Sequence, residues 1–228
     1  MTPQQVSVII PALNEAARIE AAIESAWNND AGEVIVCDGG SSDSTPQLSR
    51  ARRATVVTAA RGRGNQLGAG AQAATGCVLL FLHADNRLSD GCLYAMCQRI
   101  DASAQPQQCW GGFKQRIEEP RVLFRLLEWG NAIRIRWRGV PFGDQAVFVT
   151  RTLYDRVGGF PSVALMEDVL LSRALRRHSW PMLVDALVHI DARRWTKRGV
   201  LRQTARNWGI QLAHCLGVSE SHLEKWYR

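Results

Sequence analysis

The chain has 228 residues, of which 46% are hydrophobic and 21% charged, and its formal net charge is +7 at neutral pH. This composition is typical of a globular domain and excludes an intrinsically disordered chain. The longest purely apolar run, residues 78–82, is too short to span a bilayer, and the first residues lack the pattern of a signal peptide.

Six cysteines are present, with no CxxC pair and no pair of histidines at zinc-finger spacing. We therefore expect no structural zinc site. Several of the cysteines lie in apolar runs, which is typical of reduced thiols in the core of a cytoplasmic protein.

The first half of the chain alternates strand and helix signals. Apolar and β-branched stretches predict strands at residues 6–13, 33–40, 54–60 and 76–86. Helices are predicted at residues 14–27 and 41–53, and a Gly- and Arg-rich loop at 61–70 runs into a third helix. Strands separated by helices imply a parallel sheet, in which ligands bind beyond the carboxyl ends of the strands.

The second half is less regular. Strands are expected at residues 107–117, 143–150 and 182–190, and helices at 152–158, 167–177 and 200–216. The segment 121–138 mixes five arginines with large apolar residues at partly helical spacing. We expect its apolar residues to pack in the core, because apolar stretches are usually buried.

Polar residues follow all four strands of the first half. They are Asn14 and Glu15, then Asp38, then Arg61 and Arg63, and finally Asp85. Asp38 precedes a Gly pair that would let a ligand approach the backbone, and its carboxylate could accept from a nucleobase N–H or from ribose hydroxyls. The alternative is that Asp38 only forms a turn.

The loop at 61–70 offers two arginines and several backbone amides, which could hold phosphates or a base. It is not a P-loop, because no GK[ST] follows, and a solvated basic turn is the alternative. Asp85 could coordinate Mg²⁺ or Mn²⁺, which prefer oxygen ligands and usually keep substrate phosphates as partners. We expect His83 to pack near that site rather than to bind the metal.

Two charged groups stand later in the chain. Glu167 and Asp168 begin a predicted helix, where acids are favoured by the helix dipole alone. One of them could instead act as a general base that takes the proton of a hydroxyl. The segment 192–195 (ARRW) could clamp a diphosphate and stack on a ligand, or form a solvated basic face.

Together these segments resemble family 2 glycosyltransferases with the GT-A fold. The opening strand VSVIIPALNE (6–15) and the segment VIVCDGGSSDST (34–45) resemble the family's two nucleotide-binding signatures. Further motifs follow in the family's order: LLFLHAD (79–85), GGF (111–113), FGDQAVFV (142–149), GGFP (158–161), MEDVLL (166–171) and ARRW (192–195). The resemblance covers nearly the whole chain and is strongest to a small bacterial subgroup described as radical-SAM/selenodomain-associated transferases.

The resemblance implies an α/β chain with a mostly parallel central sheet and flanking helices. It implies a single GT-A domain over residues 1–228, with a nucleotide-binding half to about residue 105 and an acceptor-binding half from about 106. The donor would be a nucleotide-diphosphate sugar, by default a UDP-sugar, and the acceptor a small molecule, a lipid or a glycan.

The resemblance also implies roles for single residues. Asp168 would be the catalytic base with Glu167 beside it, and Asp85 would hold the metal. Donor-binding residues would be Pro11, Ala12, Glu15 and Asp38 at the nucleoside, Arg61 and Arg63 at the base or phosphates, His83 and Ala84 beside the metal, and Arg194 and Trp195 near the diphosphate and acceptor.

Two departures from the family pattern carry weight. His83 stands at the first position of the family's D-x-D motif, so one ribose or metal contact is altered. The Q-x-x-R-W pattern of processive polymer synthases is replaced by ARRW, which argues against polymer synthesis with export.

The leading hypothesis is therefore an inverting, metal-dependent sugar transferase. A nucleotidyltransferase acting on a sugar- or cofactor-phosphate is the first alternative, although the Gly-rich loop that such enzymes carry after their first strand is missing here. The second is a non-catalytic protein of the membrane surface, since residues 121–138 combine apolar side chains and arginines as an interfacial segment would. We expect no nucleic-acid partner, because no recognised module is present, and a cytoplasmic location with at most peripheral contact with the inner membrane.

Overall fold

The computed structural model describes residues 1–161, 166–193 and 209. The predicted helix at 200–216, together with Arg194 and Trp195, lies outside the described residues apart from the single helical position 209.

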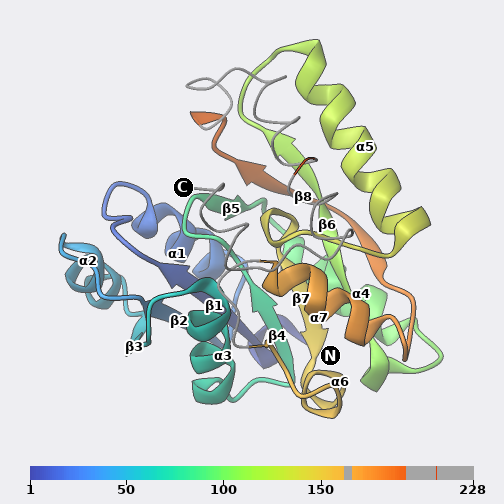
Figure 1. Cartoon of the computed structure of the whole chain (residues 1–228), viewed down its shortest axis with the longest axis horizontal. Helices are drawn as coiled ribbons and strands as arrows, with labels where there is room; N and C mark the ends of the chain where they lie inside the picture. The colour runs from blue at the N-terminus through green and yellow to red at the C-terminus, as the bar shows by residue number, and fades with distance from the viewer. Residues whose placement is uncertain (162–165, 194–208, 210–228) are drawn as a thin grey trace.

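One mixed sheet organises the described residues, with the strand order β3-β2-β1-β4-β7-β6-β8-β5 (Figure 1). The strands are β1 (Val6–Ala12), β2 (Glu33–Asp38), β3 (Thr55–Thr58), β4 (Val78–Phe81), β5 (Asn86–Leu88), β6 (Trp110–Ile117), β7 (Val147–Thr150) and β8 (Met182–Ile190). The helices are α1 (Ile19–Trp27), α2 (Thr45–Ala51), α3 (Arg63–Ala73), α4 (Cys92–Asp101), α5 (Val122–Arg138), α6 (Arg151–Arg156) and α7 (Glu167–Leu175). Short 3₁₀ turns η1 (Pro3–Gln5), η2 (Pro106–Gln108) and η3 (Gly143–Gln145) precede β1, β6 and β7.

The first four strands pair in parallel, as the alternation of strands and helices predicts. Strand β7 then runs antiparallel to β4 and to β6, β8 runs parallel to β6, and β5 runs antiparallel to β8. Because β7 enters the sheet antiparallel to β4, η3 lies at the edge where the parallel strands end. The predicted α/β class with a mostly parallel sheet is confirmed.

Both faces of the sheet are covered, because side chains alternate between them along each strand. Val8 and Ile10 pack on one face against α1 and α4. Ile9 and Leu79 pack on the other face against α3, α6 and α7. Strands buried on both faces explain the nearly continuous apolar runs of β1 and β2.

The beginnings of two helices differ from the sequence prediction. Helix α1 starts at Ile19 rather than at residue 14. The amides of residues 14–16 donate instead to the side chains of Ser41 and Asp43 in the loop after β2 and of Thr45 at the start of α2. Helix α3 starts at Arg63, inside the predicted loop, after Gly62 with a φ of 128°. A positive φ of this kind is available to glycine and ends the extended chain.

Two elements between residues 76 and 101 were predicted incompletely. The strand expected over 76–86 is split into β4 and β5, because the chain turns at residues 82–85 and joins β8. Helix α4 was not predicted at all. Its buried residues Leu93, Met96, Cys97 and Ile100 have helical spacing, so the signal was present in the sequence.

Helix α5 contradicts the expectation that residues 121–138 pack in the core. It lies along β6 and β8 and buries only Phe124 and Ile135 fully (Figure 1). Val122, Trp129 and Trp137 are 75%, 68% and 80% exposed. The prediction was wrong because the helix touches the sheet with one narrow stripe, and further apolar residues lie outside that stripe.

Within the described part of the chain, every helix is too short or too polar to cross a bilayer.

Candidate active site at the carboxyl edge of the sheet

Asp38 ends β2 and is buried, with 6% of its surface exposed. Its carboxylate accepts hydrogen bonds from the backbone amides of Gly40 and Ser41, both at 3.1 Å. Asp38 therefore does form a turn, as the alternative interpretation predicts. The same contacts fix one carboxylate at the carboxyl edge of the parallel strands.

Gln66, on the first turns of α3, ties that helix to the ends of two strands. Its Nε2 donates to the carbonyl of Ala12 at 2.8 Å and to the carbonyl of Cys37 at 2.9 Å. The residue itself is buried. Sequence reasoning missed Gln66, although it follows Arg63 by three positions and so shares a helix face with it.

Pro11 and Glu15 flank the end of β1. Pro11 is half-buried and pairs with Cys37 of β2. The amide of Glu15 donates to Thr45 Oγ1, and its carboxylate lies 3.8 Å from the guanidinium of Arg18. Since Arg18 also binds Asp191 after β8 at 2.8 Å, the loop after β1 is joined to the far part of the sheet.

An ion pair joins the N-termini of α3 and α7. Arg63 Nη1 lies 3.4 Å from Glu167 Oε1, and the Glu167 side chain is only 3% exposed. Burial raises the pKa of the Glu167 carboxyl, while the positive charge of Arg63 acts in the opposite direction. Arg61, in contrast, is exposed.

Asp168 follows Glu167 in the first turn of α7 and is half-buried. Its Oδ2 accepts the backbone N–H of Gly143 at 2.9 Å, and its Oδ1 accepts the N–H of Val169 at 2.8 Å. The side chain is therefore fixed from two elements, α7 and η3.

Gly143 also lies against His83. A Cβ at position 143 would come within 2.4 Å of His83 Nε2, so only glycine lets the two segments approach this closely. The Nδ2 of Asn86 reinforces the approach by donating to the carbonyl of Asp144 at 3.1 Å. The loop after β4 is thus joined, through η3, to Asp168.

The segment His83–Asp85 makes the turn between β4 and β5. Ala84 is buried, and Asp85 is half-buried. Among the described residues, no group of three or more His, Cys, Asp or Glu side chains is arranged to hold a metal ion. Asp85 is therefore not part of an all-protein metal cage within residues 1–161 and 166–193.

Arg134 of α5 is a half-buried cation that sequence reasoning also missed. Its guanidinium donates to Gln145 Oε1 at 2.6 Å and to the Val140 carbonyl at 3.0 Å, and it stacks 3.4 Å from the centroid of Phe142. Burial lowers its pKa to about 10, and the charges of Asp144 and Asp168 oppose that shift. Arg134 thus anchors η3, which carries the amide that binds Asp168.

The structure brings most of the predicted site residues to one edge of the sheet. Gln66 connects α3, which carries Arg63, to Ala12 of β1, and Asp38 pairs with Ala12 in the sheet. Arg63 pairs with Glu167, and Gly143 joins Asp168 to His83. Arg194 and Trp195 lie outside the described residues.

The fold is that of the GT-A glycosyltransferases. The mannosyltransferase PcManGT from Pyrobaculum calidifontis, solved with GDP-Man and Mn²⁺, superposes with a TM-score of 0.66 at 22% identity, covering 93% of this chain and 61% of that one. S. aureus TarS 1–349, solved with UDP-GlcNAc, gives 0.63 at 19% identity, covering 84% and 58%. Glucosyl-3-phosphoglycerate synthase from Mycobacterium tuberculosis, solved with Mn²⁺, UDP and glucosyl-3-phosphoglycerate, gives 0.57 at 21% identity, covering 82% and 70%.

The sequence narrows this class to a family. The model of glycosyl transferase family 2 matches residues 7–160, which is more than half of the chain, and the chain therefore belongs to that family. No curated protein matches the sequence significantly. The chain spans less than two thirds of the length of PcManGT and of TarS 1–349 in its complex with UDP-GlcNAc.

Proposed function

We propose that this protein transfers a sugar from a nucleotide-diphosphate donor, by default a UDP-sugar, to an acceptor hydroxyl with inversion at the anomeric carbon. Membership of glycosyl transferase family 2 supports the reaction class. The observation that carries the mechanism is the position of Gly143, which contacts His83 and donates its N–H to Asp168. Asp168 and the loop after β4, which would face the donor, are thereby held next to each other.

Asp168 is the proposed general base. Its two oxygens each accept one backbone N–H, and each keeps a further lone pair for an acceptor hydroxyl. The acceptor proton would move to this carboxylate as the acceptor oxygen attacks the anomeric carbon. The bond between that carbon and the diphosphate oxygen would break in the same displacement, releasing the nucleoside diphosphate.

The donor would lie over the half of the chain before about residue 105, with Pro11, Ala12, Glu15 and Asp38 around its nucleoside. Arg61 is exposed and would approach the base or the phosphates from the residues just before α3. Arg63 is already paired with Glu167, so we assign it mainly to positioning α7 against α3. The acceptor would occupy the remaining half.

The described residues offer a divalent cation only part of its coordination. Mg²⁺ and Mn²⁺ bind to enzymes through one or two carboxylates, with substrate phosphates and water completing the coordination. A half-buried Asp85 at the end of β4 can supply one such carboxylate. His83 packs against Gly143 and stands at the first position of the D-x-D motif, where the family has an aspartate. When bound, the cation would neutralise charge on the departing diphosphate.

Two measurements test the proposal. First, a thermal-shift screen of nucleoside diphosphates and their sugars, with and without Mn²⁺, should reveal a donor that raises the melting temperature, since a ligand of the native state stabilises it. If none of them stabilises the protein, the donor assignment is wrong.

Second, Asp168→Asn should reduce release of the nucleoside diphosphate from that donor by roughly 10²–10⁴-fold, the usual contribution of a general base. The thermal shift by the donor should persist. Asp155→Asn on α6, which changes an exposed carboxylate, is the matched control and should leave the rate unchanged. A normal rate in the Asp168 variant would remove it from the mechanism.

A further inference from the structure

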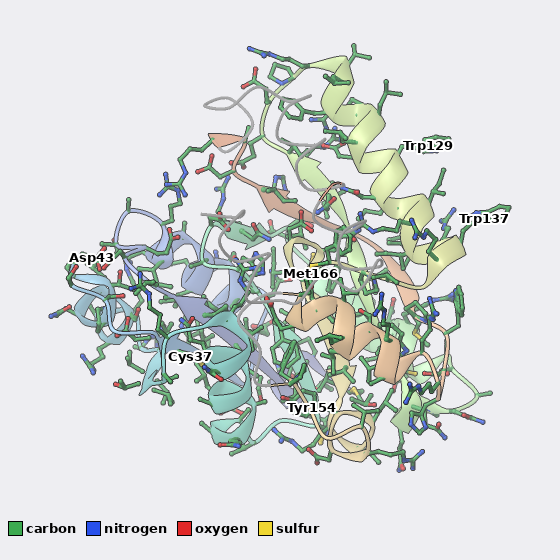
Figure 2. All side chains as sticks on the ribbon, viewed as in Figure 1. Cys37, Asp43, Trp129, Trp137, Tyr154 and Met166 are labelled. Atoms are coloured by element: carbon green, nitrogen blue, oxygen red, sulfur yellow. The ribbon has the colours of Figure 1, made fainter. Side chains whose placement is uncertain are left out.

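The outward face of α5 is an apolar stripe. Val122, Leu126, Trp129, Ile133 and Trp137 follow one another at intervals of three or four positions, which places them on one side of the helix. Leu126 is 59% exposed, and the two tryptophans are exposed more. Figure 2 shows Trp129 and Trp137 pointing away from the body of the molecule. A surface helix normally turns such a stripe towards the core.

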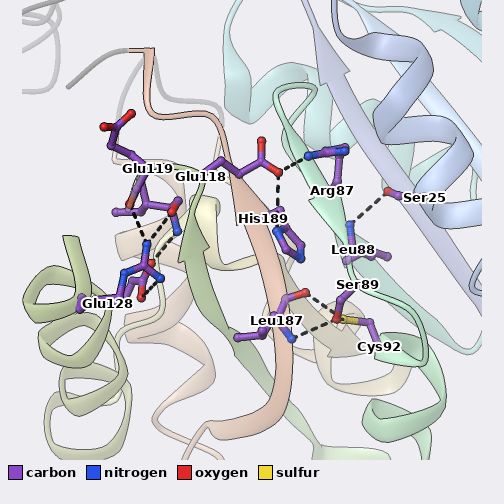
Figure 3. A network of polar contacts seen from close by, with 12 residues as sticks. Ser25, Arg87, Leu88, Ser89, Cys92, Glu118, Glu119, Glu128, Leu187 and His189 are labelled. Atoms are coloured by element: carbon purple, nitrogen blue, oxygen red, sulfur yellow. Dashed lines mark hydrogen bonds and ion pairs between the residues drawn. The ribbon is translucent and has the colours of Figure 1, made fainter. Parts of the chain in front are cut away.

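Polar contacts on the opposite face fix this orientation. Arg125 donates to the carbonyls of Ile117 and Glu119 at 2.7 and 3.0 Å. Glu128 accepts the N–H of Ile117 at 2.6 Å and pairs with Arg125 at 2.9 Å (Figure 3). Phe124 is buried between the ends of β6 and β8. Rotation of α5 to bury its stripe would break these contacts, so the exposed stripe is a built feature of the fold.

The exposed charges along α5 are all positive. Arg121, Arg136 and Arg138 are exposed, whereas Glu128, the one acidic residue of the helix, is turned inwards with a side chain only 12% exposed. A further exposed tryptophan, Trp180, donates its indole N–H to the Arg136 carbonyl at 3.0 Å. The face therefore combines large aromatic side chains with the exposed Arg136 and Arg138 at its C-terminal end, while Arg121 at the N-terminal end pairs with Glu119 at 3.3 Å.

This combination favours one occupant. A second copy of the chain would bring Arg136 and Arg138 opposite Arg121 in an antiparallel helix pair, or opposite themselves in a parallel pair, and like charges at an interface are costly. A lipid surface has the opposite chemistry, because tryptophans prefer the boundary between headgroups and acyl chains and arginines bind lipid phosphates. Contiguous exposed apolar patches usually mark interaction sites.

We propose that the outer face of α5 docks the protein on an anionic lipid bilayer. The stripe runs along α5 from Val122 to Trp137, and α5 is not long and apolar enough to cross a bilayer, so the helix would lie flat at the interface. Docking depends on α5 alone and does not require the proposed transfer reaction.

Cosedimentation of the full chain with vesicles tests the proposal. The protein should bind phosphatidylcholine vesicles that contain phosphatidylglycerol, bind pure phosphatidylcholine vesicles more weakly, and be released by salt. Trp129→Ser combined with Trp137→Ser should weaken binding by roughly tenfold or more, because two aromatic anchors are removed. Arg136→Gln with Arg138→Gln should weaken binding to the phosphatidylglycerol vesicles selectively.

Tyr94→Ser is the matched control, since Tyr94 is 60% exposed on α4 and should not affect binding. The melting temperature of each variant, and its shift by nucleotide-sugar donors without vesicles, should equal those of the wild type, which separates docking from the proposed reaction. The proposal would be overturned if the wild-type protein did not bind anionic vesicles. It would also be overturned if the double tryptophan variant bound them as tightly as the wild type does. A wild-type dimer that the tryptophan variant converts to a monomer, without vesicle binding, would assign the face to a second copy instead.

Discussion

The two sides of the candidate site are built in different ways. On the side of β1 and β2, the Asp38 carboxylate is held by its neighbours, because it binds amides two and three positions further along the chain. On the side of β7 and α7, polar groups are held by distant segments. Asp168 binds the amide of Gly143, and Glu167 pairs with Arg63 from the other half of the chain.

This difference separates what each side contributes. The turn after β2 holds the Asp38 carboxylate with its own amides, and the adjacent loop after β1 adds contacts to Ser41 and Asp43. The acid pair of α7 depends on η3 and α3 being in position, so its geometry is sensitive to changes elsewhere. We therefore expect substitutions on the second side to affect chemistry more than stability, and substitutions under the first side to do the reverse.

The largest effect is expected for Gly143→Ala. Its Cβ would lie 2.4 Å from His83 Nε2, so either the ring or the backbone of η3 must move. Displacing the amide that orients Asp168 should lower the rate of nucleoside diphosphate release by roughly 10²-fold, as small misplacements of catalytic groups do. Only a small fall in the melting temperature is expected, because the clash involves a partly exposed side chain and not the core of the protein.

Gly130→Ala on α5 is the control for that experiment, since a Cβ there meets nothing within 4 Å. Its rate should be that of the wild type. A Gly143 variant that keeps full activity would show that the Asp168 contact has no role in the reaction, and the contrast between the two sides would disappear.

On the side of β1 and β2, Gly70→Ala should lower the stability of the protein. A Cβ at Gly70 would lie 2.4 Å from Cys37 Sγ and from Ile9 Cγ2, where α3 packs on the sheet. Overpacking of this kind costs about 1–3 kcal/mol of unfolding free energy. Gly68→Ala, two positions earlier on the same helix, meets open space and should stabilise the protein by about 0.5–1 kcal/mol. Urea denaturation of both variants measures the difference, and equal stabilities would refute the close packing of α3.

The smallest effect is expected for the pH dependence of stability, which reports on the Arg63–Glu167 ion pair between the two sides. Burial raises the pKa of Glu167 in the folded protein above the ordinary value of 4.5. The folded state then binds the proton more tightly than the unfolded state, so this residue's contribution to stability is present below that value and is lost as the pH rises through the raised pKa. Relative to Glu167→Gln, the wild type should therefore lose unfolding free energy as the pH rises above 4.5 and through the raised pKa.

Denaturation curves of both proteins across this pH range check the sign. The Arg63→Gln variant should lose unfolding free energy with rising pH more steeply than the wild type does, because the charge that favours the ionised Glu167 carboxyl is removed. A wild type that gains stability over the variant as the pH rises would mean that the ion pair outweighs burial.

The same difference between the sides explains how far the sequence could be read. The parallel strands and the residues at their ends were predictable, since apolar runs ending in Asp38 or Asp85 are local patterns. Gln66, Gly143 and Arg134 were given no individual role, because their partners are set by the folded arrangement of distant segments. The exposure of α5 was mispredicted for a related reason: composition does not tell which stripe of a helix meets the sheet.

Strand β5 has a consequence for how the loop of Asp85 acquires its shape. It follows β4 almost directly, yet Leu88 pairs with Val188, one hundred positions later. Contacts of such large sequence separation form slowly, because the chain entropy of closing the intervening loop must be overcome first. During synthesis, the parallel strands can assemble early, while the turn between β4 and β5 gains its second anchor only after β8 has emerged. The turn that carries Asp85 is therefore among the last parts of the sheet to be completed.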